Sequence, residues 1–257
     1  MASDLDGTLL TSDRLVTDRT VAAVERVRAA GARFVVVTGR PVRWLTSVVE
    51  RLGDDEVMIA QNGAVVWHPA TNEVLASHPL ELDLITSLVA QLAEDDPELG
   101  WAVERPLDYA RTPNFATLLS DDGVEVAPIE ALLDRPLTKL LARAERFDPR
   151  RFERIRALVG DAAEVSHSGN DALIEIAAPG VHKAATLATL ATDWGVAAED
   201  VIAFGDQVND EQMLAWAGRG VAMGNAAPHV RRMADEVTGT NDEGGVARVL
   251  EREFPGE

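Results

Sequence analysis

The first 63 residues alternate between short apolar runs and amphipathic segments, and this order limits the folds open to the chain. Residues 33–38 read Arg-Phe-Val-Val-Val-Thr, and an uninterrupted apolar run closed by Thr38-Gly39 is typical of a strand buried on both faces of a parallel sheet. An alternating β-α-β-α-β order predicts an open α/β sheet whose ligands bind at the carboxyl ends of strands. The expected strands and helices have bounds near 1–4, 17–30, 33–38, 41–53 and 57–60.

After this region the pattern changes to a mixture of short strands and single helices. Residues 79–179 form an α+β pattern, with turns expected at 121–123 and 168–170. The alternation of strands and helices resumes after Pro179-Gly180. We therefore predict a doubly wound parallel sheet built from residues 1–78 and 180–257, with residues 79–179 inserted as a second domain.

The charge of the chain restricts its partners. Its 257 residues include 43 Asp and Glu against 24 Lys and Arg, a formal net charge of −19. Nucleic acid requires a basic face, so we predict no such partner. The absence of cysteine excludes disulfides and thiolate metal sites, and no apolar run is long enough to cross a membrane. The N-terminus has no basic and then apolar segment, so we expect a cytoplasmic protein.

The opening segment, Ser3-Asp4-Leu5-Asp6-Gly7, places two carboxylates two positions apart. At the end of a strand, residues i and i+2 leave on one side, so Asp4 and Asp6 can face the same space. Gly7 follows, where the chain can bend. Neighbouring carboxylates are costly unless one is protonated or a cation lies between them, and Mg²⁺ prefers such oxygen ligands. An acidic surface turn is the alternative interpretation.

Three further segments lie at predicted strand ends or helix starts of the same α/β domain. They are Thr38-Gly39, Lys183 and Gly205-Asp-Gln-Val-Asn-Asp210. Taken singly, they also fit a strand-to-helix turn, a solvated helix residue and a helix cap, respectively. Only two of the 24 basic residues are Lys, at positions 139 and 183. Against such a bias toward Arg, a lysine can mark a place that needs a compact point charge.

In order and spacing, these four segments resemble the signature motifs of phosphatases of the haloacid dehalogenase (HAD) superfamily, and the resemblance is nearest to the Cof-like subfamily. The insert matches only by position and length. The resemblance implies a Rossmann-like core, a cap domain over residues 79–179, and Mg²⁺-dependent hydrolysis of a small phosphorylated metabolite, by analogy a sugar or polyol phosphate. The matching segments are Asp4-Leu-Asp-Gly-Thr-Leu-Leu10, Val37-Thr-Gly-Arg40, Gln61-Asn-Gly63, Gly205-Asp-Gln-Val-Asn-Asp210 and Val221-Ala-Met-Gly-Asn-Ala226.

The resemblance also implies roles for the residues that react. Asp4 is the nucleophile, which forms an aspartyl-phosphate that water hydrolyses, and it binds Mg²⁺. Asp6 is the general acid and then the general base, and its backbone carbonyl also contacts Mg²⁺. Lys183 neutralises charge on the phosphate and on Asp4.

Five further positions follow from the same resemblance. Asp206 and Asp210 are the remaining Mg²⁺ ligands, the latter directly or through water. Thr38 and Gly39 hold the phosphoryl oxygens through the Thr38 hydroxyl and nearby backbone N–H groups. Asn209 lies beside the phosphate and positions the acidic cluster.

Three other residues have simpler interpretations. Asn62 belongs to a turn dipeptide near the site and receives no catalytic role. Arg40 either binds substrate or pairs with acids of the insert, and we favour a structural role for it. His182, next to Lys183, is expected to be exposed and without function.

Other functions remain open at this level. A phosphotransferase or mutase on the same scaffold would pass the phosphoryl group to a sugar phosphate instead of water. A receiver-type signalling module also uses Asp, Thr and Lys, but has about half this length. A third alternative is a family member that binds its ligand without turnover, because only Met1-Ala2-Ser3 precede Asp4 where the family usually has a longer apolar strand. We expect that start to be misassigned or trimmed.

Overall fold

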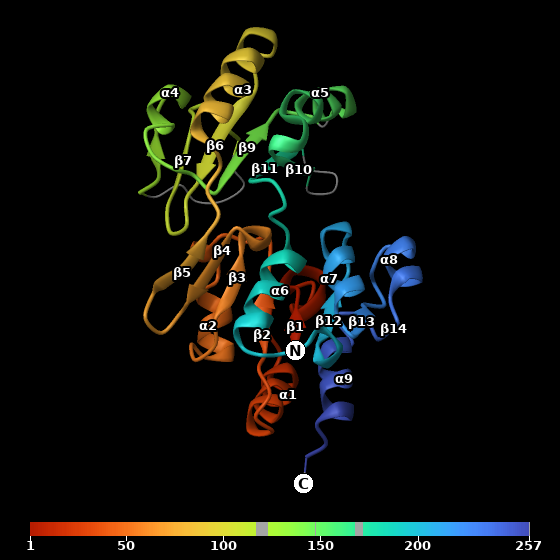
Figure 1. Cartoon of the computed structure of the whole chain (residues 1–257). Coiled ribbons are helices and arrows are strands. Elements are labelled where there is room, and N and C mark those ends of the chain that lie inside the picture. Colours follow the sequence, from red (N-terminus) through yellow and green to blue (C-terminus); the bar gives the residue numbers. More distant parts are fainter. Residues whose placement is uncertain (117–122, 147, 168–171, 257) are drawn as a thin grey trace. The chain divides into compact units, whose positions relative to one another are not determined.

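The computed structural model describes residues 1–116, 123–146, 148–167 and 172–256. They fall into two compact units (Figure 1), one formed by Met1–Ala76 with His182–Glu257 and the other by Ser77–Val181. The first unit is discontinuous in sequence, and the second is a single stretch between its halves. The expected turns at 121–123 and 168–170 contain positions that lie outside the described residues.

The first unit is built on an eight-stranded sheet with the order β14-β13-β12-β1-β2-β3-β4-β5. The strands from β14 to β3 run parallel, whereas β4 pairs antiparallel with β3. The sheet is mixed because the link from β3 to β4 is the short turn Gln61–Gly63, and parallel pairing would need a long crossover. In the order of the sheet, the strands span Glu236–Val237, Arg219–Ala222, Ile202–Gly205, Ala2–Ser3, Val35–Val37, Met58–Ala60, Val65–His68 and Glu73–Ser77.

Strand β1 has only two residues, yet it lies between β12 and β2 within the sheet. Hydrogen bonding continues on both sides of it. The backbone N–H of Asp4 donates to the carbonyl of Phe204 at 3.0 Å. The ammonium group of Met1 donates to the carbonyl of Arg33 at 2.7 Å. These bonds fix the backbone at Asp4, directly after the strand.

Of the two helices predicted before the insert, the first has the expected limits and the second begins later than expected. The side chain of Thr17 caps the first turn of α1 (Asp18–Ala29). The helix predicted from Pro41 begins later, because Pro41 itself is extended, with ψ 156°. A 3₁₀ turn, Val42–Trp44, comes next and is followed by α2 (Thr46–Leu52). The other helices of this unit are α6 (Lys183–Asp193), α7 (Glu211–Trp216), α8 (Pro228–Met233) and α9 (Gly245–Glu253).

Helices pack on the sheet in two groups. Helix α1 lies beside α9 and α2, and α6 lies beside α7 (Figure 1). Their apolar sides and the sheet form one core, which includes Leu5, Val24, Ile59, Phe204 and Leu250. This burial holds the strands in register, so the loops at their carboxyl ends have a rigid base.

The second unit has a separate six-stranded sheet with the order β10-β11-β9-β6-β7-β8. All its pairs are antiparallel except the parallel pair of β7 and β8. A core of its own joins the sheet to three helices, α3 (Leu82–Asp95), α4 (Ile129–Leu132) and α5 (Pro149–Val159). In chain order from β6, the strands span Gly100–Glu104, Tyr109–Arg111, Glu125–Val126, Lys139–Arg143, Glu164–His167 and Leu173–Ala177.

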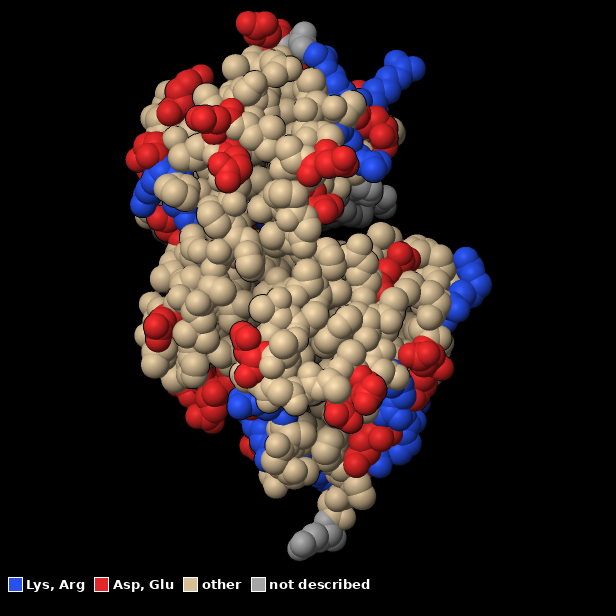
Figure 2. All heavy atoms as spheres, in the orientation of Figure 1, with Lys and Arg blue, Asp and Glu red and all other residues tan. Residues whose placement is uncertain are grey.

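The surface in Figure 2 carries charges of both signs. Asp and Glu side chains are spread over both units on this face, and the Lys and Arg side chains lie among them without forming one continuous basic patch. Among the described residues, no helix combines the length and the apolar character needed to cross a membrane.

Candidate active site

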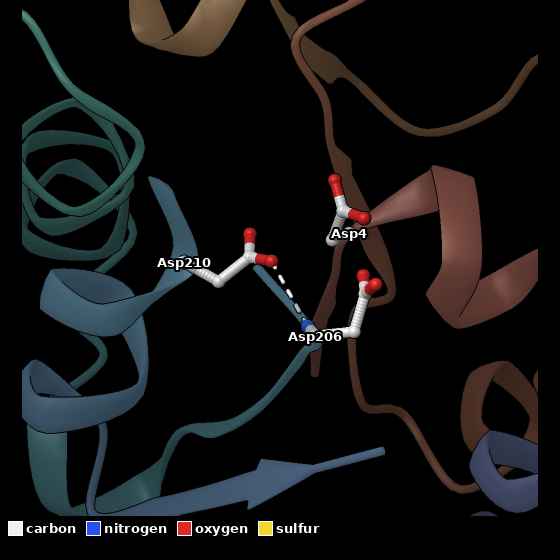
Figure 3. A group of neighbouring side chains, drawn as sticks. All are labelled: Asp4, Asp206 and Asp210. Atoms are coloured by element: carbon white, nitrogen blue, oxygen red, sulfur yellow. Dashed lines mark hydrogen bonds between the residues drawn. The ribbon is translucent and has the colours of Figure 1, made fainter. Parts of the chain in front are cut away.

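Three carboxylates meet at the carboxyl ends of two neighbouring strands. Asp4 follows β1, Asp206 follows β12, and Asp210 ends the 3₁₀ turn that leads into α7. All three residues are buried, and one carboxylate oxygen of each lies within 4.8 Å of the others. Figure 3 shows the three side chains around a common space. Acids from the two ends of the sequence are thus brought into one group.

Lys183 begins α6, and its ammonium group lies between two of these carboxylates. Its Nζ atom donates to Asp4 Oδ1 at 2.5 Å and to Asp210 Oδ1 at 2.6 Å. The Lys183 side chain is only 1% exposed, so water does not screen these contacts. One ammonium group therefore faces three carboxylates. If all three are ionised, the cluster has a net negative charge that Lys183 alone does not balance.

Backbone and side-chain donors hold the acids in place. Asp210 Oδ2 accepts from the backbone N–H groups of Asp206 and Gln207, both at 3.0 Å. Asp206 accepts from the hydroxyl of Thr8 and from the side-chain amide of Gln207, both at 2.9 Å. Gly7 leaves room for this arrangement, because its φ is +78° and a Cβ there would lie 2.5 Å from an Asp206 oxygen.

Asp4 and Asp206 are harder to ionise than isolated carboxyl groups. Burial raises the pKa of Asp4 to about 8, and Asp210 and Asp206 add to the rise, while Lys183 opposes it. Burial also raises the pKa of Asp206, with Asp210 contributing. Burial alone would lower the pKa of Lys183, but the charges of Asp210 and Asp4 outweigh it and raise that pKa. Lys183 is therefore an ammonium ion at neutral pH.

The donor set of this group fits a hard divalent cation. Mg²⁺ binds carboxylate oxygens, and the three acids Asp4, Asp206 and Asp210 supply them from a buried position. A divalent cation together with Lys183 would also balance the charge of three carboxylates. Such a cation favours the ionised form of each acid and so counteracts the effect of burial on Asp4.

Asp6 points to a different partner. Its carboxylate accepts two hydrogen bonds from Arg40, from Nε at 2.7 Å and from Nη2 at 2.5 Å. The Asp6 side chain is 53% exposed, and its carboxylate is not part of the group formed by Asp4, Asp206 and Asp210. Arg40 therefore pairs with Asp6, a partner that the two alternatives considered from the sequence, substrate and the acids of the insert, did not include. Such a two-point contact fixes the direction of both side chains.

The residues expected around the phosphate lie in two loops. The Thr38 hydroxyl accepts the backbone N–H of Arg40 at 3.1 Å, and the Thr38 side chain is buried. Gly39 lies against Asn62, because a Cβ at Gly39 would be 2.9 Å from Asn62 Oδ1. The exposed Asn209 donates its side-chain N–H to the same Asn62 oxygen at 3.1 Å. Asn62 thus joins the two loops.

Sequence reasoning missed several supporting contacts. His182 is not an exposed bystander, because its Nδ1 accepts the backbone N–H of Ala185 at 3.2 Å and caps α6. Thr8 and Gln207 both hold Asp206, and their places inside the matching motifs could have indicated them as supporting residues. Asn225 donates to the carbonyl of Gly7 at 2.8 Å and so supports the bend after Asp6.

A family model of haloacid dehalogenase-like hydrolases matches residues 1–250 of the chain. The chain belongs to this family. The match includes both halves of the first unit and the whole second unit. It confirms the resemblance to HAD phosphatases of the Cof-like branch, the predicted fold class and the prediction of a phosphomonoesterase hydrolase.

Relatives of known name and solved structure match this chain over nearly their full length. The 5-amino-6-(5-phospho-D-ribitylamino)uracil phosphatase YitU of Bacillus subtilis is 33% identical over 271 residues, which cover 99% of this chain and 97% of YitU. A putative phosphatase of Haemophilus influenzae is 30% identical and covers 98% and 97% of the two chains. A solved structure of a HAD superfamily phosphatase from Bacteroides thetaiotaomicron superposes with a TM-score of 0.83 at 25% sequence identity. The superposition covers 98% of this chain and 93% of that structure.

Proposed function

We propose that the chain is a Mg²⁺-dependent phosphomonoesterase that acts on a small phosphorylated metabolite through an aspartyl-phosphate on Asp4. The contact of Lys183 with both Asp4 and Asp210, beside Asp206, carries this proposal. Enzymatic phosphoryl transfer depends mainly on positioning and on compensating negative charge. A buried ammonium group next to a donor set for a divalent cation provides both.

In the first step, a carboxylate oxygen of Asp4 forms a bond to phosphorus while the bond from phosphorus to the leaving oxygen breaks. For this step Asp6 must leave Arg40 and be protonated in the substrate complex, and it then gives its proton to that oxygen, so the organic product leaves as an alcohol. Lys183 remains protonated and offsets charge on the phosphoryl group. Bound Mg²⁺ supplies further positive charge there.

In the second step, water attacks the phosphorus atom of the aspartyl-phosphate. Asp6, now a carboxylate, takes a proton from the water, and the bond between phosphorus and the Asp4 oxygen breaks. Inorganic phosphate leaves, and both acids return to their starting forms. The hydroxyl of Thr38, the loop at Gly39 and the amide of Asn209 hold the phosphoryl oxygens during both steps.

The substrate class follows from the relatives and from the second unit. YitU and two further relatives, YcsE of Bacillus subtilis and YbjI of Escherichia coli, are named as phosphatases of a ribitylamino-uracil phosphate, which contains a phosphorylated polyol. We propose a sugar or polyol phosphate for this chain as well. The unit Ser77–Val181 would serve as its cap, which excludes water and selects the organic part of the substrate.

The test compares the wild-type protein with Asp4→Asn in the hydrolysis of an aryl phosphate, with Mg²⁺ and with EDTA. We expect turnover only for the wild type with Mg²⁺. Equal rates for the two proteins would defeat the assignment of Asp4 as the nucleophile. A panel of phosphorylated sugars and polyols then identifies the substrate, and an added sugar phosphate acceptor distinguishes phosphoryl transfer from release of inorganic phosphate.

A further inference from the structure

The turn after β3 has a strained backbone. Gln61, Asn62 and Gly63 all have positive φ, of 54°, 57° and 107°. A left-handed conformation costs roughly 1–2 kcal/mol for an ordinary L-residue, and only Gly and, less readily, Asn adopt it often. Strain of this kind persists where surrounding contacts fix the segment, and it is concentrated at functional sites. The mechanism above assigns no role to this turn.

On one side the turn is bonded to the loop that contains Thr38. The backbone N–H of Asn62 donates to the carbonyl of Thr38 at 2.9 Å, and the N–H of Gln61 donates to the carbonyl of Arg40 at 3.0 Å. Gly39 lies between these two positions, where any side chain would meet Asn62. The path of the Thr38–Arg40 loop therefore depends on the conformation of the turn.

On another side the turn contacts the start of α6. The hydroxyl of Thr186 donates to the carbonyl of Gly63 at 2.7 Å. A Cβ at Gly63 would lie 2.7 Å from the carbonyl oxygen of His182, so the two backbones are in close contact. His182 directly precedes Lys183, and the turn thus packs against the backbone from which the ammonium group extends.

The third contact is made by a side chain. Asn62 Oδ1 accepts from the side-chain amide of Asn209 at 3.1 Å, and Asn209 is next to Asp210. We propose that Asn62 is a positioning residue, whose side-chain oxygen holds Asn209, and with it the neighbouring Asp210 that binds Lys183, in the arrangement that phosphoryl transfer requires. This proposal rests on the proposed phosphatase function.

The chain offers a matched control. Asn72 also has a left-handed backbone, with φ 51°, and its side-chain oxygen also accepts a hydrogen bond, from Trp67 Nε1 at 3.0 Å. It lies in the turn between β4 and β5, away from the motifs. Asn62→Gly and Asn72→Gly therefore remove the same group from the same kind of backbone, and Gly accepts the positive φ in both.

The experiment measures kcat and KM for an aryl phosphate, together with the unfolding temperature, for both variants. Because a small displacement of catalytic groups can cost about 100-fold in rate, we expect a loss of that order in kcat for Asn62→Gly, with KM nearly unchanged. Asn72→Gly should keep the wild-type kcat. The double variant Asn62→Gly with Asn209→Ala should lose no more kcat than the more impaired single variant, because the two substitutions remove the same hydrogen bond.

Other results would overturn the proposal. The first is a kcat for Asn62→Gly equal to that of Asn72→Gly. The second is a loss of kcat in Asn62→Gly that the fraction of unfolded protein explains completely. The third is a double variant whose loss of kcat equals the product of the two single losses. If the wild type shows no turnover, the proposed function fails by itself. Calorimetry of Mg²⁺ with beryllofluoride, a mimic of the phosphoryl group, then tests the positioning role, because Asn62→Gly should weaken this binding and Asn72→Gly should not.

Discussion

Replacing Lys183 by Met removes the ammonium group from the buried acids and keeps the length of the side chain. Lys183 holds two carboxylates, at 2.5 and 2.6 Å, and is 1% exposed. Removing one partner of a buried ion pair costs about 3–5 kcal/mol, and with two partners we expect the upper end of that range, about 5 kcal/mol. For a domain of this size, this corresponds to a fall in Tm of about 10–20 °C in metal-free protein.

The loss should also depend on pH. Asp4 has a pKa of about 8 in the folded protein, above its ordinary value, so its ionisation destabilises the fold increasingly as pH rises toward 8. The pKa of Lys183 is raised, so its own stabilising charge is fully present over this range. Without Lys183, the pKa of folded Asp4 should rise further, so the variant loses extra stability only where Asp4 of the wild type ionises. This extra loss should begin near pH 8 and be larger at pH 9 than at pH 5.

The assay is thermal and urea unfolding of the wild type and Lys183→Met at pH 5 and pH 9, each with EDTA and with Mg²⁺. Added Mg²⁺ should recover part of the loss at pH 9, because it replaces the missing positive charge. Lys139→Met is the control, since it breaks a buried pair with Glu175, 2.7 Å long, in the other unit. A loss of stability of Lys183→Met that is no larger at pH 9 than at pH 5, or equal recovery of both variants by Mg²⁺, would refute the reasoning.

Two further predictions concern the segment after Asp4. Asp6→Asn should lower kcat by about 10²–10⁴-fold, as expected for loss of a general acid, while calorimetry should show unchanged Mg²⁺ binding because this carboxylate is outside the acid group. Gly7→Ala should weaken Mg²⁺ binding, since its Cβ would lie 2.5 Å from an Asp206 oxygen, whereas Gly31→Ala, with φ +76° and nothing within 4 Å, should not. Equal effects of the two Gly variants on Mg²⁺ binding would contradict the steric argument.

The pattern of the sequence predicted the core because its strands are apolar throughout and its helices are amphipathic. Parallel strands of such a sheet end at one edge, and from this rule alone Asp4 and Asp206 are expected to lie close together. The rule did not reveal the antiparallel β4, which results from the short turn after β3. The preference of Pro for the first turn of a helix predicted the start of α2 too early, because Pro41 also tolerates the extended backbone that it has here.

The contacts of individual side chains were less predictable. The pairing of Arg40 with Asp6 depends on the directions in which two loops leave neighbouring strands, and residue spacing does not determine them. The capping role of His182 was missed because histidine is not a common cap residue. Asn62 was interpreted as a simple turn residue, since its contacts with Thr38 and Asn209 involve partners distant in sequence.

The place of β1 in the sheet has a consequence for biosynthesis. Its neighbours are β2, close by in sequence, and β12, which is separated from it by the entire second unit. During translation, Ser77–Val181 leaves the ribosome as a continuous stretch whose strands pair only with one another, so it can fold first. The surroundings of Asp4 are complete only after Lys183 and Asp210 have been synthesised. A chain interrupted anywhere before that point would carry Asp4, the proposed nucleophile, without Lys183 and Asp210 beside it.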